Sequence, residues 1–143
     1  MALTWTIDAE APAKDVATVV NGVFAHGRSQ AKDGDAEPIS CLVRDKTLVV
    51  AGGSGRTEYH RLFVNHLWVA EELRGQGIGS RILLLLESEA ARRGCRDALI
   101  ETLDDSVARF YDRLGYKQIA FVASYVGHFN RHIMLKPSVT VPE

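Results

Sequence analysis

Apolar residues recur along the chain at two spacings, and these spacings predict a mixture of strands and helices. Residues 3–8 alternate apolar and polar side chains, which predicts a short strand. Residues 13–26 place valines and Phe24 at helical intervals, which predicts a helix. Residues 27–38 are polar, contain glycine and show no periodicity, so they predict an exposed loop of the kind that often shapes a substrate entrance.

The middle of the chain has the character of a sheet. Two β-rich runs, residues 39–44 and 48–57, are separated by polar residues and predict an antiparallel hairpin. Three glycines at 52, 53 and 55 interrupt the second run, where they predict either a bulge and close backbone approach or a flexible hairpin end. Residues 62–69 are almost continuously apolar, which predicts a central strand covered on both faces.

The strongest helical pattern covers residues 78–93 and ends at Gly94, which suits a left-handed terminal residue. Its apolar stripe is Ile78, Ile82, Leu85, Leu86 and Ala90, while Ser80, Arg81, Glu87, Ser88 and Arg92 are expected to face water. Residues 97–103 then predict another strand.

The last part of the chain predicts one short helix and a closing hairpin. Val107, Phe110, Tyr111 and Leu114 form one helical face, entered through Asp105 or Ser106 and ended by Gly115. Residues 116–126 and 129–135 are β-rich and predict a hairpin around Gly127.

Length and composition favour one compact domain over residues 1–143, since the chain is 46% hydrophobic and 24% charged. The formal net charge of −1 gives no general attraction to nucleic acid or to an anionic membrane, so neither is an expected partner. The longest uninterrupted apolar run, residues 82–86, falls far short of the roughly 20 residues of a membrane span. Without a visible secretory signal, we expect a cytoplasmic protein.

Metal and redox chemistry find no support in the sequence. Cys41 and Cys95 stand alone, without the paired spacing of a zinc or redox motif, and are expected to be buried free thiols. His60, His128 and His132 are scattered without a metal-ligand rhythm. No metal is therefore expected.

The stretch Arg74-Gly75-Gln76-Gly77-Ile78-Gly79-Ser80 carries the strongest chemical signal, because it joins a predicted strand to the strongest predicted helix. A helix start offers backbone N–H groups without intrahelical partners and a partial positive charge, which suits a phosphate group. Glycines remove the side chains that would hold a diphosphate away, and Arg74 can add a cationic fork. A tight turn alone would explain an isolated glycine triplet, but the flanking strand and helix favour anion binding.

The segment LWVAEELRGQGIGSRILLLLE, followed by ETLDDSVARFYDRLGY, resembles the GCN5-related N-acetyltransferase (GNAT) superfamily, whose signature is Arg or Gln, two residues, Gly, one residue, then Gly or Ala. The resemblance implies an α/β domain with a mixed, mostly antiparallel sheet, flanking helices and one central parallel strand pair that splays to hold acetyl-CoA. The cofactor-binding residues implied are Leu67, Trp68, Val69, Arg74, Gly75, Gln76, Gly77, Ile78, Gly79, Ser80 and Asp104. Asp104 departs from the family pattern, in which Asn is common.

The resemblance also implies a catalytic role for Tyr111, which would protonate the departing thiolate. Tyr111 lies on the apolar face of its helix as well, where it would pack in any case. The base that deprotonates the acceptor is left open between His66, Glu101 and a chain of water molecules.

The expected function is transfer of an acetyl group from acetyl-CoA to a primary amine of a small molecule or protein, by direct attack in a ternary complex. One alternative is a catalytically inactive acetyl-CoA-binding module. Another is a dinucleotide-binding oxidoreductase, which Ser80 opposes because it replaces the third glycine of that fingerprint. The sequence leaves the acceptor and a homodimer undecided.

Overall fold

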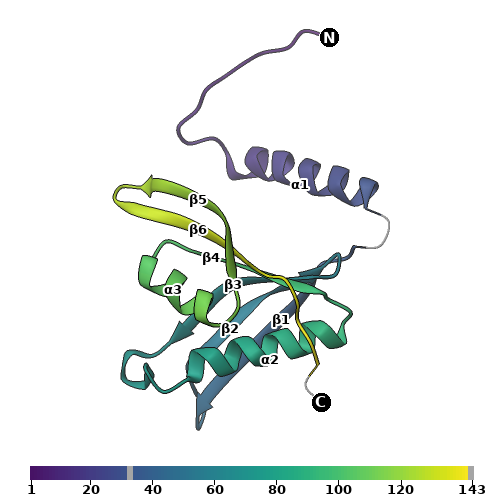
Figure 1. Cartoon of the computed structure of the whole chain (residues 1–143). Coiled ribbons are helices and arrows are strands. Elements are labelled where there is room, and N and C mark those ends of the chain that lie inside the picture. Colours follow the sequence, from purple (N-terminus) through teal and green to yellow (C-terminus); the bar gives the residue numbers. More distant parts are fainter. Residues whose placement is uncertain (32–33, 142–143) are drawn as a thin grey trace. The chain divides into compact units, whose positions relative to one another are not determined.

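The computed structural model describes residues 1–31 and 34–141, which divide into two compact units, Met1–Gly34 and Asp35–Glu143. The first unit contains helix α1 (Ala13–Gln30), and the second contains a sheet and its helices (Figure 1). In chain order, the second unit has β1 (Glu37–Asp45), β2 (Leu48–Glu58), β3 (Arg61–Val69), the 3-10 helix η1 (Glu71–Leu73), α2 (Ile78–Arg92), β4 (Asp97–Thr102), α3 (Asp105–Arg113), β5 (Lys117–Val126) and β6 (Phe129–Lys136).

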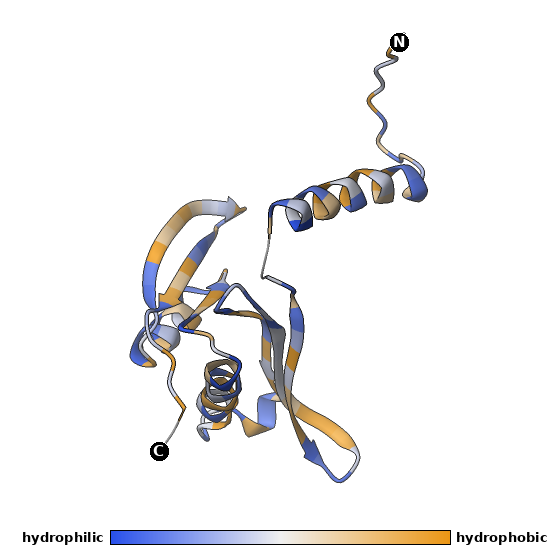
Figure 2. Ribbon diagram, turned by 90° about the vertical axis from the view of Figure 1, so that its right-hand side faces the viewer, coloured by the Kyte–Doolittle hydropathy of each residue, from blue (hydrophilic) through white to orange (hydrophobic). Residues whose placement is uncertain are grey.

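The first unit corrects two predictions. Residues 3–8 form no strand, because the described residues of the first unit include no second strand to accept their backbone hydrogen bonds. Helix α1 runs through Gly27 to Gln30, and β1 begins at Glu37, so the predicted loop over 27–38 is shorter than expected. Residues 32–33 of that loop lie outside the described residues. Apolar and polar residues alternate around α1, as Figure 2 shows, and none of its residues is buried.

The sheet confirms the predicted fold class. Its strand order is β1-β2-β3-β4-β6-β5, and β3 with β4 is the parallel pair within an otherwise antiparallel arrangement. Helix α2 packs against β1, β2 and β3, whereas α3 packs against β4, β5 and β6 (Figure 1). Both predicted hairpins, β1 with β2 and β5 with β6, are present.

The central parallel pair, β3 and β4, separates part of the way along its length. Pairing between β3 and β4 ends at Val64 and Ile100, although β3 continues to Val69 and β4 to Thr102. At the same level, the register between β2 and β3 shifts between Ser54 and Gly55, which leaves Asn65 as an extra residue in β3. Such a bulge bends a strand locally. We call the resulting opening beyond Val64 and Ile100 the β3–β4 gap.

Glycine is required on β2 opposite this bulge. A Cβ built at Gly55 would lie 1.8 Å from the carbonyl oxygen of Phe63, a separation that no side chain tolerates. The glycines in β2 thus mark a bulge and a close backbone approach, rather than a flexible hairpin end.

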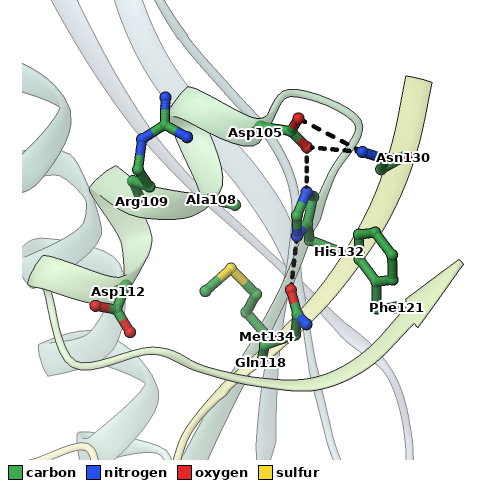
Figure 3. Close-up of a pocket in the computed structure, with 9 residues that line it drawn as sticks. All are labelled: Asp105, Ala108, Arg109, Asp112, Gln118, Phe121, Asn130, His132 and Met134. Carbon is green, nitrogen blue, oxygen red and sulfur yellow. Dashed lines mark hydrogen bonds and ion pairs between the residues drawn. The ribbon is translucent and has the colours of Figure 1, made fainter. Parts of the chain in front are cut away.

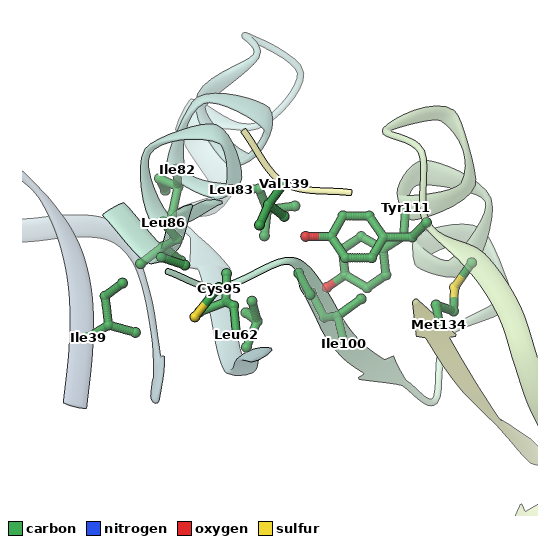
Figure 4. Close-up of a cluster of buried hydrophobic side chains, with 14 of the residues drawn as sticks. Ile39, Leu62, Ile82, Leu83, Leu86, Cys95, Ile100, Tyr111, Met134 and Val139 are labelled. Carbon is green, nitrogen blue, oxygen red and sulfur yellow. The ribbon is translucent and has the colours of Figure 1, made fainter. Parts of the chain in front are cut away.

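The hydrophobic core lies between the sheet and helices α2 and α3 (Figure 4). Its largest fully buried side chains are Tyr116, Leu62, Ile82, Leu83 and Leu86. Burial alternates along β3 instead of covering both faces, so the prediction of a strand buried on both sides is wrong within this unit. Cys95 is buried as predicted, and Cys41 is half-buried.

Helix α2 also corrects the predicted stripe. Leu85, expected in the core, is 50% exposed, while Leu83 is buried in its place. Glu87, expected to face water, is only 4% exposed. Its carboxylate accepts a hydrogen bond from the Tyr116 hydroxyl at 2.8 Å and pairs with Lys136 Nζ at 2.7 Å. The helix can bury this charge because partners arrive from a distant part of the chain.

Candidate functional site

The backbone N–H groups at the N-terminus of α2 are left free to bind a ligand. Gly75 and Gly77 have φ angles of 76° and 80°, a left-handed conformation that glycine adopts without steric cost. Gly77 is the N-cap residue and provides no side chain, so no side-chain cap occupies the N–H groups of the first helical turn. A Cβ at either glycine would meet nothing within 4 Å, which means that the loop faces open space.

Arg74 stands beside this open helix end. Its Nε donates to the carbonyl oxygen of Val69 at 3.0 Å, which fixes the guanidinium at the junction of β3 and the loop. A guanidinium held there adds positive charge to the partial positive charge of the helix N-terminus. Together these groups can bind an anion with two charges.

The end of β3 offers a free backbone edge next to the loop. Leu67, Trp68 and Val69 pair with β2 on one side, but the parallel register with β4 has already ended on the other. Leu67 and Val69 pack against the core, and Trp68 is exposed. The backbone groups of these residues that face the β3–β4 gap can therefore pair with an extended ligand.

Helix α3, unlike α2, has an N-terminus that is capped by a side chain. Asp104, and not Asp105 or Ser106, is its N-cap: Oδ1 accepts hydrogen bonds from the Ser106 N–H at 2.7 Å, the Ser106 hydroxyl at 2.6 Å and the Val107 N–H at 3.2 Å. These bonds, that of the Ser106 side chain first, lower the pKa of Asp104. The Asp104 side chain thus occupies N–H groups of the first turn of α3, whereas no side chain occupies those of α2.

We expect Asp104→Ala to lower the free energy of unfolding by about 1 kcal/mol at neutral pH, the usual cost of losing an N-cap. Because the pKa of Asp104 is lower in the folded chain, its contribution is complete above the unfolded carboxyl pKa and is lost as the pH falls through the folded value. Urea unfolding at neutral and acidic pH measures this difference. Asp104→Asn, which keeps an acceptor oxygen but no charge, should retain most of the stability and lose the pH dependence.

Tyr111 lies on the core side of α3 and is 5% exposed. It belongs to the buried cluster that includes Val64 and Ile100, the last paired residues before the β3–β4 gap (Figure 4). Its hydroxyl makes no hydrogen bond with any residue that the structure describes. Burial raises the pKa of Tyr111 to about 12, which keeps the phenol protonated.

The two base candidates lie on the strands that border the gap. Both His66 on β3 and Glu101 on β4 are exposed. Glu101 forms an ion pair with Arg131 of β6 and lines a pocket of about 330 Å³ beside the gap.

A second pocket, of about 480 Å³, lies between α3 and the hairpin of β5 and β6 (Figure 3). At its base, His132 is 9% exposed and its ring nitrogens lie 2.6 Å from Asp105 Oδ1 and 2.6 Å from Gln118 Oε1. The hydrogen bond from His132 is the main cause of a lowered pKa of Asp105. Ala108 of α3 and Met134 of β6 line this pocket and also belong to the buried cluster that contains Tyr111, so the pocket borders the core beside α3.

Reasoning from the sequence missed the roles of His132, Arg131 and Glu87. Their partners lie 27, 30 and 49 residues away along the chain, so no local pattern identifies them.

None of the helices in the described residues has the length and hydropathy needed to cross a bilayer. Within the same residues, His, Cys, Asp and Glu side chains form no group of three placed to hold a metal ion.

Comparisons with known proteins agree with this architecture. A family model described as "Acetyltransferase (GNAT) family" matches residues 12–116. The chain is 34% identical over 98 residues to the acetyltransferase Atu2258 of Agrobacterium fabrum, an alignment that covers 68% of this chain and 72% of the relative. A solved structure from Agrobacterium tumefaciens aligns with a TM-score of 0.86 and 27% identity over 94% of this chain and 98% of that chain. An aminoglycoside 6'-N-acetyltransferase solved with coenzyme A aligns with a TM-score of 0.62 and 23% identity over 75% and 76% of the two chains.

Proposed function

Because the chain belongs to the acetyltransferase (GNAT) family and is thus an acyltransferase, we propose that it transfers an acetyl group from acetyl-CoA to a primary amine of a small molecule or protein. The observation that carries this proposal is the contrast between the two helix starts, one uncapped and faced by open space, the other closed by Asp104. Family membership excludes the dinucleotide-binding oxidoreductase.

We also propose that residues 1–143 act as one domain, since the family match spans both units. A cytoplasmic location remains a prediction from the sequence, which leaves a homodimer undecided.

The residues of the loop and of β3 fit the chemistry of the cofactor. Backbone N–H groups of Ile78, Gly79 and Ser80 bind the diphosphate, with Arg74 and the Gly75–Gly77 turn around it. The free edge of Leu67, Trp68 and Val69 pairs with the pantetheine arm. We also assign Asp104 to the cofactor site because of its position in the family pattern, although its Oδ1 already accepts a hydrogen bond as the N-cap of α3. When bound, acetyl-CoA supplies an acetyl group activated as a thioester.

Catalysis requires attack by the acceptor and protonation of the leaving sulfur. The amine nitrogen attacks the acetyl carbon directly in a ternary complex, forming a C–N bond as the C–S bond breaks. Tyr111 donates its phenolic proton to the departing thiolate and regains one from solvent. The proton lost by the acceptor passes to Glu101, to His66 or to a chain of water molecules; among these, Glu101 lines the pocket at the gap.

Replacing Gly77 tests the diphosphate site. We expect Gly77→Val to raise the Kd for acetyl-CoA at least about tenfold, or about 1.4 kcal/mol, because its side chain would enter the space in front of the helix donors. Isothermal titration calorimetry measures the change.

The matched control is Gly127→Val, because Gly127 also has a positive φ, of 56°, and open space around its Cβ, but lies in the turn between β5 and β6. It should suffer similar backbone strain and bind acetyl-CoA normally. Unchanged affinity in a folded Gly77→Val variant would remove the site assignment. Thiol release assayed with a panel of amines tests turnover, and acetyl-CoA binding without release from any amine would support the inactive module instead.

A further inference from the structure

The 330 Å³ pocket beside the β3–β4 gap opens on the face of the sheet away from α2 and α3. Its lining residues Phe63, Leu99 and Glu101 alternate with the buried residues that face the helices. Val64 and Ile100, the last pair before the gap, also line it. This gap pocket therefore meets the opening between the strands from the side opposite Tyr111.

One wall of the gap pocket carries a carboxylate that is only partly engaged. Glu101 Oε2 pairs with Arg131, whose guanidinium also donates to the Tyr125 hydroxyl at 2.6 Å and lies 4.8 Å from the centre of that ring. The Oε1 atom of Glu101 has no hydrogen bond within the described part of the chain. Arg131 thus orients Glu101 at the gap while one carboxylate oxygen remains available to a donor.

The wall formed by β2 carries a guanidinium that is also partly engaged. Arg56 Nε bonds to Glu58 Oε2 at 3.0 Å, and the guanidinium stacks on Phe63 with 4.1 Å to the ring centre. Its two Nη groups make no hydrogen bond with any residue the structure describes. The Arg56 and Glu58 side chains are 39% and 30% exposed, and such surface pairs contribute little, so another carboxylate can replace Glu58 at low cost.

We propose that the gap pocket binds a small acceptor that carries both a primary amine and a carboxylate. Arg56 holds the carboxylate through its Nη groups, and Glu101 Oε1 accepts a hydrogen bond from the amine at the gap. The two unengaged groups have opposite charge and stand on β2 and β4, on either side of β3, so they match the two ends of such a molecule. A pocket of this volume lies near the lower end for ligand sites, which suits a molecule of amino-acid size.

This acceptor class rests on the proposed acetyl transfer and is tested by comparing acids with their amides. The probes are glycine, β-alanine, 4-aminobutanoate and lysine, each assayed beside the same molecule with a carboxamide in place of the carboxylate. In the unaltered chain, kcat/KM from thiol release should be about 10- to 100-fold higher for at least one acid than for its amide, the usual effect of a hydrogen bond to a charged group. In Arg56→Gln this ratio should fall to about one.

Arg44→Gln is the matched control, because Arg44 is an exposed arginine on β1 that does not line the gap pocket. Arg44→Gln should keep the acid-to-amide ratio of kcat/KM that the unaltered chain has. A ratio lost in Arg56→Gln alone is then not the result of a general loss of stability. Amides used as well as acids, or no acceptor turned over by a chain that still binds acetyl-CoA, would overturn this acceptor class and leave the cofactor site intact. Failure to bind acetyl-CoA would overturn the proposed function and this inference together.

Discussion

Tyr111→Phe is expected to lower kcat by about 100-fold while the Kd for acetyl-CoA changes little, because the change removes a general acid and keeps the ring. Tyr111 packs in the cluster that also contains Val64 and Ile100, so phenylalanine can fill the same space. Only the hydroxyl, which has no hydrogen bond among the described residues, is lost. The effect should therefore appear in turnover rather than in folding.

The raised pKa of Tyr111 bears on this role. Burial moves the pKa from 10.0 to about 12, so the hydroxyl remains protonated over the range in which activity can be assayed. The raised pKa also makes the phenol a weaker acid than an ordinary thiol, so donation to the thiolate depends on close positioning of the two groups. No loss of activity from ionisation of Tyr111 is expected until the pH approaches that value. Any fall in rate at acidic pH should come from protonation of the acceptor amine or of its base, and should persist in Tyr111→Phe.

Steady-state thiol release, with calorimetry for cofactor affinity, measures both quantities. Tyr59→Phe is the matched control, since Tyr59 is an exposed tyrosine in the turn between β2 and β3. It should retain full turnover. Full activity of Tyr111→Phe would mean that Tyr111 only packs and that another group, or water, protonates the sulfur.

Lys136→Met should lower the free energy of unfolding by about 3–5 kcal/mol, because it leaves the carboxylate of Glu87 buried without its cation. The side chains of Glu87 and Lys136 are 6% and 21% exposed, and the Nζ atom lies 2.7 Å from Oε1. The Tyr116 hydroxyl, 2.8 Å from Oε2, would remain as a neutral donor and compensate only in part. Chemical denaturation at neutral pH measures the loss.

Glu87→Gln separates the buried charge from packing. Glutamine keeps an acceptor for Tyr116, and Lys136 is exposed enough to extend its ammonium toward water, so we expect a smaller loss of about 1–2 kcal/mol. Adding Lys136→Met to Glu87→Gln should cost little more, which gives a coupling of about 3–4 kcal/mol between the two positions. Additive effects, or a Lys136→Met loss no larger than that of Glu87→Gln, would show that the pair is not a buried ion pair in solution.

Local patterns in the sequence predicted the elements that place the cofactor loop. The alternation and turn residues around Gly127 predicted the last hairpin, and the motif from Arg74 to Ser80 predicted a glycine turn opening a helix. The glycines of β2 left a bulge and a flexible hairpin end as alternatives, and the structure shows the bulge, in β3 opposite Gly55. These predictions succeed because turn chemistry, strand alternation and helix capping depend on residues close together in the chain.

Errors arose where a residue's environment depends on distant partners. The alternation in residues 3–8 indicates a strand, but a strand forms only when another strand accepts its hydrogen bonds. Helical spacing cannot tell which of Leu83 and Leu85 meets the sheet, because that choice depends on how α2 is rotated against β1, β2 and β3.

The sequence by itself determined the order of the strands and α-helices from α1 onward, and the glycine loop that opens α2. Tertiary structure alone decided that Glu87 is buried with Lys136, that His132 meets Asp105, and that Arg56 and Glu101 line one pocket. The physical reason is that burial, ion pairing and pocket shape bring together side chains from helices and strands that are far apart in the chain, and local periodicity carries no information about such contacts.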